Sequence, residues 1–250
     1  MHFTIVTAFI SLEKYGNLEK RRTKDDFINH ARAFTLSLPF PLYCFLEKEN
    51  VDEVLNIRNK LGLGNLTRII TVDFNQLPLA LYMDKLSSFP RTNNKFLYPS
   101  KNPAYPIIIN SKSYFLRQAI SENKYKSEYF MWVDFAANSK KYTLNTIDSL
   151  KRMMSKPYPK VAIGVFDPKK IIPYEVLMVG IHYVSVGTIF TLSKNSEEFL
   201  DLWDKEEIKA INSGLYPFEE SIFYYLTKQR PDLFNVIVST YETYIQKYIE

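Results

Sequence analysis

The chain has 250 residues, of which 46% are hydrophobic and 24% are charged, and this ordinary globular composition excludes an intrinsically disordered protein. Only seven glycines occur, which argues against a glycine-rich nucleotide cradle or a repeat array. The net charge of +5 favours anionic ligands, and phosphate-bearing small molecules fit this charge as well as nucleic acids do.

The cysteine content and the N-terminal segment indicate in which cellular compartment the protein works. Cys44 is the only cysteine, so neither an intrachain disulfide nor a cysteine-based zinc site can form, and a reducing compartment fits. The N-terminal apolar stretch spans only about eight residues without a basic segment ahead of it, which predicts a buried strand rather than a signal peptide. No apolar run reaches the roughly 18 to 20 residues that cross a bilayer. We therefore expect a cytoplasmic protein without a transmembrane segment.

The predicted elements alternate between strands and helices. Apolar runs rich in β-branched residues predict strands over residues 3–10, 41–47, 67–74, 129–135, 160–166 and 234–240, and two antiparallel strands within 176–193 that break near Gly187. Apolar residues at helical spacing predict helices over residues 27–34, 51–62, 75–89, 107–121, 143–155, 195–214, 217–229 and 241–250. This order predicts one doubly wound α/β domain with the first strand at its centre. Residues 75–106 include a proline-rich loop that we expect to be a mobile or substrate-facing insertion.

The familiar catalytic motifs are absent from the sequence. The glycines within residues 61–67 lack a third partner and precede a strand, so they form no Rossmann fingerprint. The chain has no GxxxxGK[ST], GxSxG, HExxH or CxxC motif, which excludes P-loop NTPases, the common hydrolases and the familiar zinc enzymes. What remains is a small set of acids at the ends of predicted elements.

Asp134 is the most informative of these acids. It is the only charged residue in the apolar strand over 129–135 and lies near its carboxyl end. In an open α/β sheet, ligands bind beyond the carboxyl ends of strands, where an acid can meet a metal, a ribose or a sugar hydroxyl. The alternative is an aspartate that caps a loop amide.

Glu219 and Glu220 stand at the start of the helix that is predicted to begin at Pro217. The helix dipole alone favours acids at this end, by about 0.3 to 1 kcal/mol each. Position in the sequence therefore leaves both a functional and a purely structural interpretation open for this pair.

Three stretches together resemble a known family. They are residues 3–10 (FTIVTAFI), residues 129–136 (YFMWVDFA) preceded by 110–112 (NSK), and residues 184–190 (VSVGTIF) followed by 214–223 (GLYPFEESIF). The resemblance is to the HtrL/YibB (WlaTC/HtrL) proteins, which belong to the GT-A glycosyltransferase-like nucleotide-diphospho-sugar transferases. In that family a tryptophan, an aliphatic residue and an aspartate are followed closely by glycine. Trp132, Val133 and Asp134 match this pattern, whereas Ala136 replaces the glycine.

The resemblance implies a GT-A-like α/β fold over residues 1–250, a single domain with a mostly parallel central sheet and helices on both faces. It implies transfer of a sugar from a nucleotide-diphosphate donor to a glycan or other hydroxyl acceptor, on a glycolipid or a glycoprotein. Asp134 takes the place of the Asp-x-Asp motif that holds Mn²⁺ or Mg²⁺ on the donor pyrophosphate. This chain contains no Asp-x-Asp, so one carboxylate would hold the ion through waters, or basic side chains would replace it.

The resemblance also assigns roles to other residues. Glu219 and Glu220 match a Glu-Asp pair that begins a helix below the acceptor, with Glu220 at the position of the general base. The nucleotide base and ribose are expected near Thr7 and Ala8, at the carboxyl end of the first strand. The alternative is that Thr7 is an ordinary strand residue.

Arg58 and Lys112 are candidate phosphate contacts of the donor, because guanidinium and ammonium groups pair with phosphate oxygens. The alternative is that both are solvated on helix surfaces. A rival function is a non-catalytic module that binds a nucleic acid or another polyanion, or a glycan, without turnover. Because the basic residues are scattered among acids, we expect no nucleic-acid partner.

Overall fold

Seven strands form one sheet in a computed structural model of the chain, which describes residues 3–15, 23–89, 102–137, 144–155, 159–174, 189–216, 218–240 and 244–249. The strands are β1 (Phe3–Phe9), β2 (Leu42–Leu46), β3 (Thr67–Thr71), β4 (Tyr129–Val133), β5 (Val161–Val165), β6 (Ile189–Ser193) and β7 (Phe234–Val238). Their order is β3-β2-β1-β4-β6-β5-β7, and β6 alone of these runs antiparallel to its neighbours. The strand order reverses at β1 and β4, which is where open α/β sheets bind ligands.

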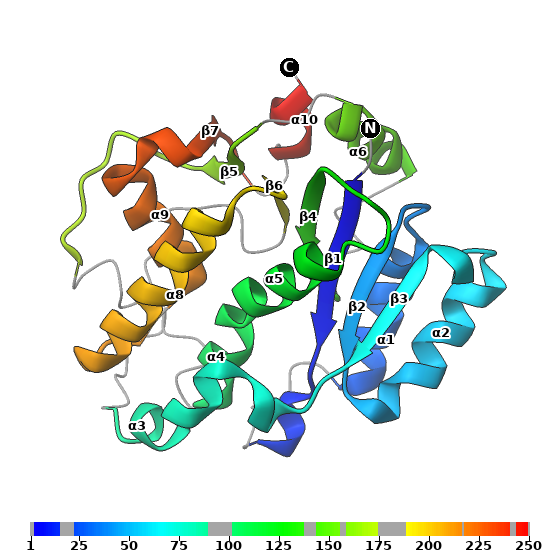
Figure 1. The fold of residues 1–250 in the computed structure, drawn as a ribbon, viewed down its shortest axis with the longest axis horizontal. Helices are drawn as coiled ribbons and strands as arrows, with labels where there is room; N and C mark the ends of the chain where they lie inside the picture. Colours follow the sequence, from blue (N-terminus) through cyan, green and yellow to red (C-terminus); the bar gives the residue numbers. More distant parts are fainter. Residues whose placement is uncertain are drawn as a thin grey trace.

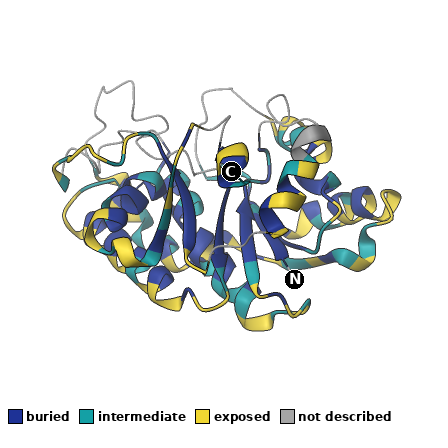
Figure 2. Ribbon diagram, turned by 90° about the horizontal axis from the view of Figure 1, so that it is seen from above, coloured by how far each residue is buried: buried dark blue, intermediate teal, exposed yellow. Residues whose placement is uncertain are grey.

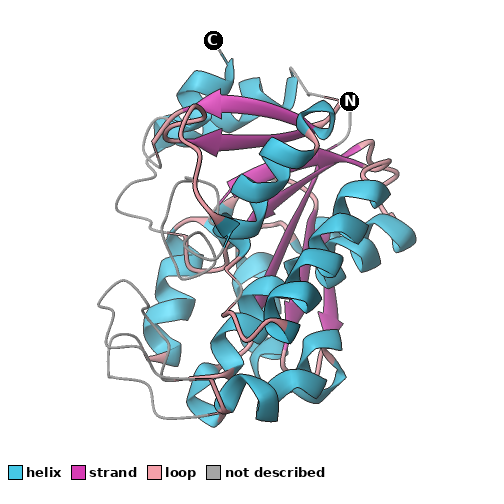
Figure 3. Ribbon diagram, turned by 90° about the vertical axis from the view of Figure 1, so that its left-hand side faces the viewer, coloured by secondary structure: helices cyan, strands magenta, loops and turns pink. Residues whose placement is uncertain are grey.

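Helices cover both faces of the sheet (Figures 1 and 3). They are α1 (Lys24–Ala33), α2 (Val51–Lys60), α3 (Met83–Ser87), α4 (Ala104–Asn110), α5 (Lys112–Glu122), α6 (Leu144–Ser155), α8 (Glu197–Asn212), α9 (Glu219–Gln229) and α10 (Tyr244–Ile249). On one face, α5 lies across β1 and β4 beside α8, which packs against α9. On the other face, Phe27 of α1 packs against Phe9 of β1. Sites at the strand ends are therefore enclosed from both sides.

The strands between the edge strands β3 and β7 are buried at nearly every position (Figure 2). Every residue of β2 and β5 is buried, as expected for apolar runs that are covered by helices on both faces. On the α5 face, Trp203 of α8 packs edge-on against Phe223 of α9, and both rings contact Phe190 of β6. This aromatic cluster fixes α9 against the sheet, and α9 carries two of the candidate acids, Glu219 and Glu220, in its first turn.

The α/β architecture expected from the sequence, with a mostly parallel sheet and helices on both faces, is confirmed. The helix predicted over residues 107–121 is divided into α4 and α5, which meet at Ser111. Residues 75–89 contain short 3-10 turns and α3 instead of one helix, because Pro78 suits the start of a helical turn but not its interior. Residues 90–101 of the expected insertion, one of the two strands expected within 176–193, and Pro217 lie outside the described residues.

Candidate active site

The turn that follows β4 presents Asp134 at the carboxyl end of the strand. Its backbone carbonyl accepts hydrogen bonds from the Ala137 amide and the Thr35 hydroxyl, both at 3.0 Å. The Trp132 indole Nε1 donates to Asp134 Oδ1 at 2.7 Å. The Asp134 side chain is 37% exposed, so a carboxylate held in a fixed orientation reaches the surface at this point.

Lys112 connects this turn to the neighbouring helix. It is the first residue of α5, and its side chain is only 6% exposed. The Lys112 Nζ lies 3.0 Å from Asp134 Oδ1 and 5.3 Å from the centre of the Trp132 ring, and it also donates to Glu219 Oε1. Burial by itself lowers the pKa of Lys112, but the two carboxylates raise that pKa to about 12. Lys112 is therefore a fixed positive charge.

Glu219 is the first residue of α9, and its side chain is 8% exposed. Burial raises the pKa of Glu219, and the charge of Lys112 only partly opposes this effect. Its second oxygen, Oε2, is buried and has no hydrogen-bond partner among the described residues. Buried polar atoms normally have a partner, so this carboxyl oxygen keeps an unused acceptor position beside the lysine.

Lys112, Asp134 and Glu219 form a group that we name the buried triad. All three are residues that the sequence analysis singled out, and they come from α5, the end of β4 and the start of α9. Glu220 is only partly buried, and the structure brings Glu219 rather than Glu220 to Lys112. In this group the Lys112 ammonium balances negative charge, and the Glu219 carboxylate, whose pKa is raised, can accept a proton.

Ala8 and Thr7 lie near the end of β1. Val6 pairs with Trp132, so Ala8 on β1 stands at the level of Asp134 beside β4. Thr7 shares its side of the sheet with Phe9, which packs on α1, and side chains alternate along a strand. The structure therefore brings Ala8 toward the buried triad and turns the Thr7 side chain to the opposite face.

Arg58 does not join the buried triad. It is fully buried in α2, and its guanidinium donates to the Thr67 hydroxyl at 2.7 Å and to the carbonyls of Leu36, Leu38 and Phe40 at 2.7 to 3.0 Å. Thr67 is the first residue of β3, and Phe40 directly precedes the segment that enters β2. Arg58 thus donates hydrogen bonds at the amino ends of β2 and β3, whereas Asp134 lies at the carboxyl end of β4. We therefore leave Arg58 out of the donor site.

Replacing Arg58 with methionine is expected to lower the free energy of unfolding by about 3 kcal/mol, because buried carbonyls would lose their donors. Urea unfolding measures this change. Arg32→Met is the matched control, since Arg32 is exposed on α1 and lies 3.9 Å from the likewise accessible Glu53; its expected change is within about 0.5 kcal/mol. An Arg58→Met protein of normal stability with weakened nucleotide binding would return Arg58 to the donor site.

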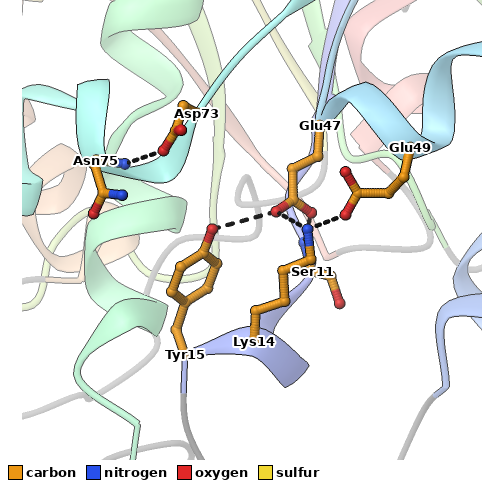
Figure 4. A network of polar contacts seen from close by, with 7 residues as sticks. All are labelled: Ser11, Lys14, Tyr15, Glu47, Glu49, Asp73 and Asn75. Carbon is orange, nitrogen blue, oxygen red and sulfur yellow. Dashed lines mark hydrogen bonds and ion pairs between the residues drawn. The ribbon is translucent and has the colours of Figure 1, made fainter.

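A second polar network, which the sequence analysis did not identify, joins the ends of β1, β2 and β3 (Figure 4). Buried Glu47, just after β2, accepts hydrogen bonds from the Ser11 amide at 2.7 Å, Lys14 Nζ at 2.9 Å and the Tyr15 hydroxyl at 3.3 Å. The Tyr15 ring stacks on Phe74 at 4.1 Å. Burial and the nearby Glu47 carboxylate raise the pKa of Tyr15 to about 12. The network fixes the segment after β1, so this side of the site has a defined wall.

The surroundings of Asp134 do not fit the Mn²⁺ or Mg²⁺ ion that the resemblance implies. The Oδ1 atom already accepts from the Lys112 ammonium and the Trp132 indole, and a divalent cation on the same carboxylate would be repelled by Lys112. Within the described ranges, no three His, Cys, Asp or Glu residues are grouped so that they could hold a metal. We therefore derive no step through a metal ion.

Known protein sequences match this chain along much of its length. A family model described as "Bacterial protein of unknown function (HtrL_YibB)" matches residues 1–245. Protein HtrL of Escherichia coli (strain K12) is 27% identical over 142 residues, which are 54% of this chain and 48% of that protein. The match thus spans about half the length of this curated relative.

Solved structures show a similar arrangement. Mouse xyloside xylosyltransferase 1, in its apo form, matches with a TM-score of 0.52 and 12% identity over 100% of this chain and 94% of that chain. A 4-diphosphocytidyl-2C-methyl-D-erythritol synthase from Anaerococcus prevotii matches with a TM-score of 0.46 and 9% identity over 99% and 95% of the two chains. The first likeness shows the fold, which is that of GT-A glycosyltransferases. None of the helices in the described part of the chain has the length and apolar character needed to cross a bilayer.

Proposed function

We propose that this chain, which belongs to the HtrL_YibB family of bacterial proteins of unknown function, is a glycosyltransferase. It transfers a sugar from a nucleotide-diphosphate donor to a hydroxyl group of a glycan, on a glycolipid or a glycoprotein. The transferase-like fold supports the reaction class, and the single buried cysteine is consistent with work in the cytoplasm.

The observation that carries the proposal is the buried triad at the carboxyl ends of β1 and β4. The strand order reverses at these two strands, and open α/β sheets bind ligands beyond the carboxyl ends of their strands at such a point. Asp134 reaches the surface there, and Ala8 lies at the same level. We place the donor diphosphate beside Asp134 and its nucleoside along the end of β1, next to the wall formed by Glu47 and Tyr15.

The reaction needs one bond to form and one to break. The oxygen of the acceptor hydroxyl bonds to the anomeric carbon of the sugar, while the bond from that carbon to the diphosphate oxygen breaks. The electron pair of the broken bond leaves with the nucleoside diphosphate. Glu219 accepts the proton of the hydroxyl through Oε2, which has no hydrogen-bond partner among the described residues, and its raised pKa suits a base that acts near neutral pH.

A nucleoside diphosphate is expected to stabilise the folded protein. At about 100 times its dissociation constant, the ligand adds roughly 2.7 kcal/mol to the free energy of unfolding. Thermal unfolding with UDP, GDP, CDP and dTDP, and with their sugar conjugates, measures the shift and identifies the base. Inorganic sulfate at equal ionic strength is the control for unspecific anion effects.

Thermal unfolding with nucleotides, together with a measurement of nucleic-acid affinity, separates the proposal from its rival. If none of the nucleotides raised the unfolding temperature, with or without Mn²⁺, the result would contradict a glycosyltransferase. An affinity for RNA or DNA that falls steeply with salt would instead support a polyanion-binding module.

A further inference from the structure

We infer that the ammonium group of Lys112 takes the place of a divalent cation in this site, so that the donor diphosphate binds without a metal ion. The inference rests on the glycosyltransferase function proposed above and names the group that balances the charge of the donor.

The position of Lys112 supports this role. Its ammonium lies between the two carboxylates of the site, 3.0 Å from Asp134 Oδ1 and bonded to Glu219 Oε1. The Trp132 ring lies beside it, and the Trp132 indole donates to the same Asp134 oxygen. A lysine that was merely solvated at the start of a helix would be exposed. The Lys112 side chain is instead 6% exposed, and it joins α5 to the end of β4 and the start of α9.

The charges of the site balance in the same way as those of a metal site. Two carboxylates that hold a divalent ion contribute two negative and two positive charges, which sum to zero. Asp134 and Lys112 contribute one of each, which also sums to zero. Glu219 adds a negative charge only when it is deprotonated, and burial favours its protonated form.

Lys112 would act where charge develops during transfer. When the bond between the anomeric carbon and the diphosphate breaks, the electron pair stays on the phosphate oxygen, which becomes more negative. A cation that is already fixed beside Asp134 stabilises this charge without reorganising. The ammonium also occupies the carboxylate that a metal ion would need, so one feature explains both the binding of the donor and the poor fit of a metal.

Nucleoside diphosphate binding tests the inference without requiring a known acceptor. Isothermal titration calorimetry with UDP, GDP, CDP and dTDP is carried out once with EDTA and once with Mn²⁺. The variant Lys112→Gln removes the charge and keeps hydrogen-bonding ability. Lys112→Gln/Glu219→Gln also removes the carboxylate that would otherwise be buried without its partner. Lys151→Gln removes an equal charge from an exposed position on α6 and is the matched control.

The wild-type protein is expected to bind its preferred nucleoside diphosphate equally well with EDTA and with Mn²⁺. Lys112→Gln and the double variant should bind at least about tenfold more weakly in EDTA, and Mn²⁺ should restore part of the loss because Asp134 becomes available. Lys151→Gln should behave like the wild type.

The contrary results distinguish a failure of this inference from a failure of the proposed function. Wild-type binding that requires Mn²⁺ would overturn the role of Lys112 and leave the glycosyltransferase proposal standing. Unchanged affinity of a folded Lys112→Gln or double variant in EDTA would also overturn it. If the wild type bound none of the nucleotides in either buffer, the proposed function itself would fail, and the inference with it.

Discussion

Replacing Asp134 with asparagine is expected to lower the turnover of the nucleotide-sugar donor by about 10²- to 10³-fold, as the loss of one preorganised electrostatic group does in other enzymes. Asparagine keeps the shape of the side chain and an acceptor oxygen for Lys112 and Trp132. It removes the negative charge that holds the ammonium of Lys112 in place. Donor hydrolysis or transfer rates measure the loss of turnover, and the melting temperature shows that the fold remains.

Asp232→Asn is the matched control for this variant. Asp232 is also an ion-paired aspartate, 2.7 Å from Arg230, but it is exposed and precedes β7, an edge strand that lies three places from β4 in the sheet. Its loss should leave turnover unchanged. If Asp134→Asn lost about 0.5 to 2 kcal/mol of stability and kept its activity, Asp134 would be a loop cap and not part of the site.

The sequence was informative about the site wherever the local pattern determined the environment. The place of Asp134 at the end of a strand could be predicted, because a single charge in an apolar run is expected at an end of the buried strand. The strand in question, β4, is one of the two at which the strand order reverses. Contact between Lys112 and Glu219 could not be predicted, because 107 positions separate them and only the packing of α5 and α9 brings them together. Long-range proximity of this kind is a property of the whole fold.

Two assignments could have been improved from periodicity alone. Arg58 follows Val54 by four positions and Ile57 by one, and all three are buried, so the inward stripe of α2 contained the arginine. Glu219 precedes Ile222, Phe223 and Leu226 by three, four and seven positions, which places it on the buried face of α9. Glu220 was favoured by resemblance to a motif, whereas the helical phase indicates its neighbour.

Replacing Glu219 with glutamine is expected to lower turnover by about 10²- to 10⁴-fold, the usual contribution of a general base. Glutamine is nearly isosteric and offers Lys112 an oxygen acceptor, but it cannot accept the proton of the acceptor hydroxyl. Donor affinity, measured with the nucleoside diphosphate alone, should stay close to that of the wild type, because the base acts on the acceptor. Initial rates at saturating donor and calorimetry with the nucleoside diphosphate separate the two effects.

The pKa of Glu219 determines the direction in which activity and stability change with pH. Burial raises the pKa of Glu219 from its ordinary value to about 8, against the opposing charge of Lys112 and with a further increase from Asp134 and Glu220. Only the deprotonated form is a base, so activity should rise with pH and level off above about 8. The folded state favours the protonated form, so the stability that Glu219 contributes is complete below about 4.5 and is lost as pH rises through about 8. Activity and this part of the stability should therefore change in opposite directions.

Glu220→Gln is the matched control, because it makes the same chemical change one residue along the same first turn of α9. It should keep most of the turnover and the rising limb of the pH profile, whereas Glu219→Gln should lose both. The opposite pattern, with Glu220→Gln inactive and Glu219→Gln active, would assign the base to Glu220. In that case the buried contact with Lys112 would serve to position α9, because a buried carboxylate paired with a lysine can hold a helix in place without taking a proton from the acceptor.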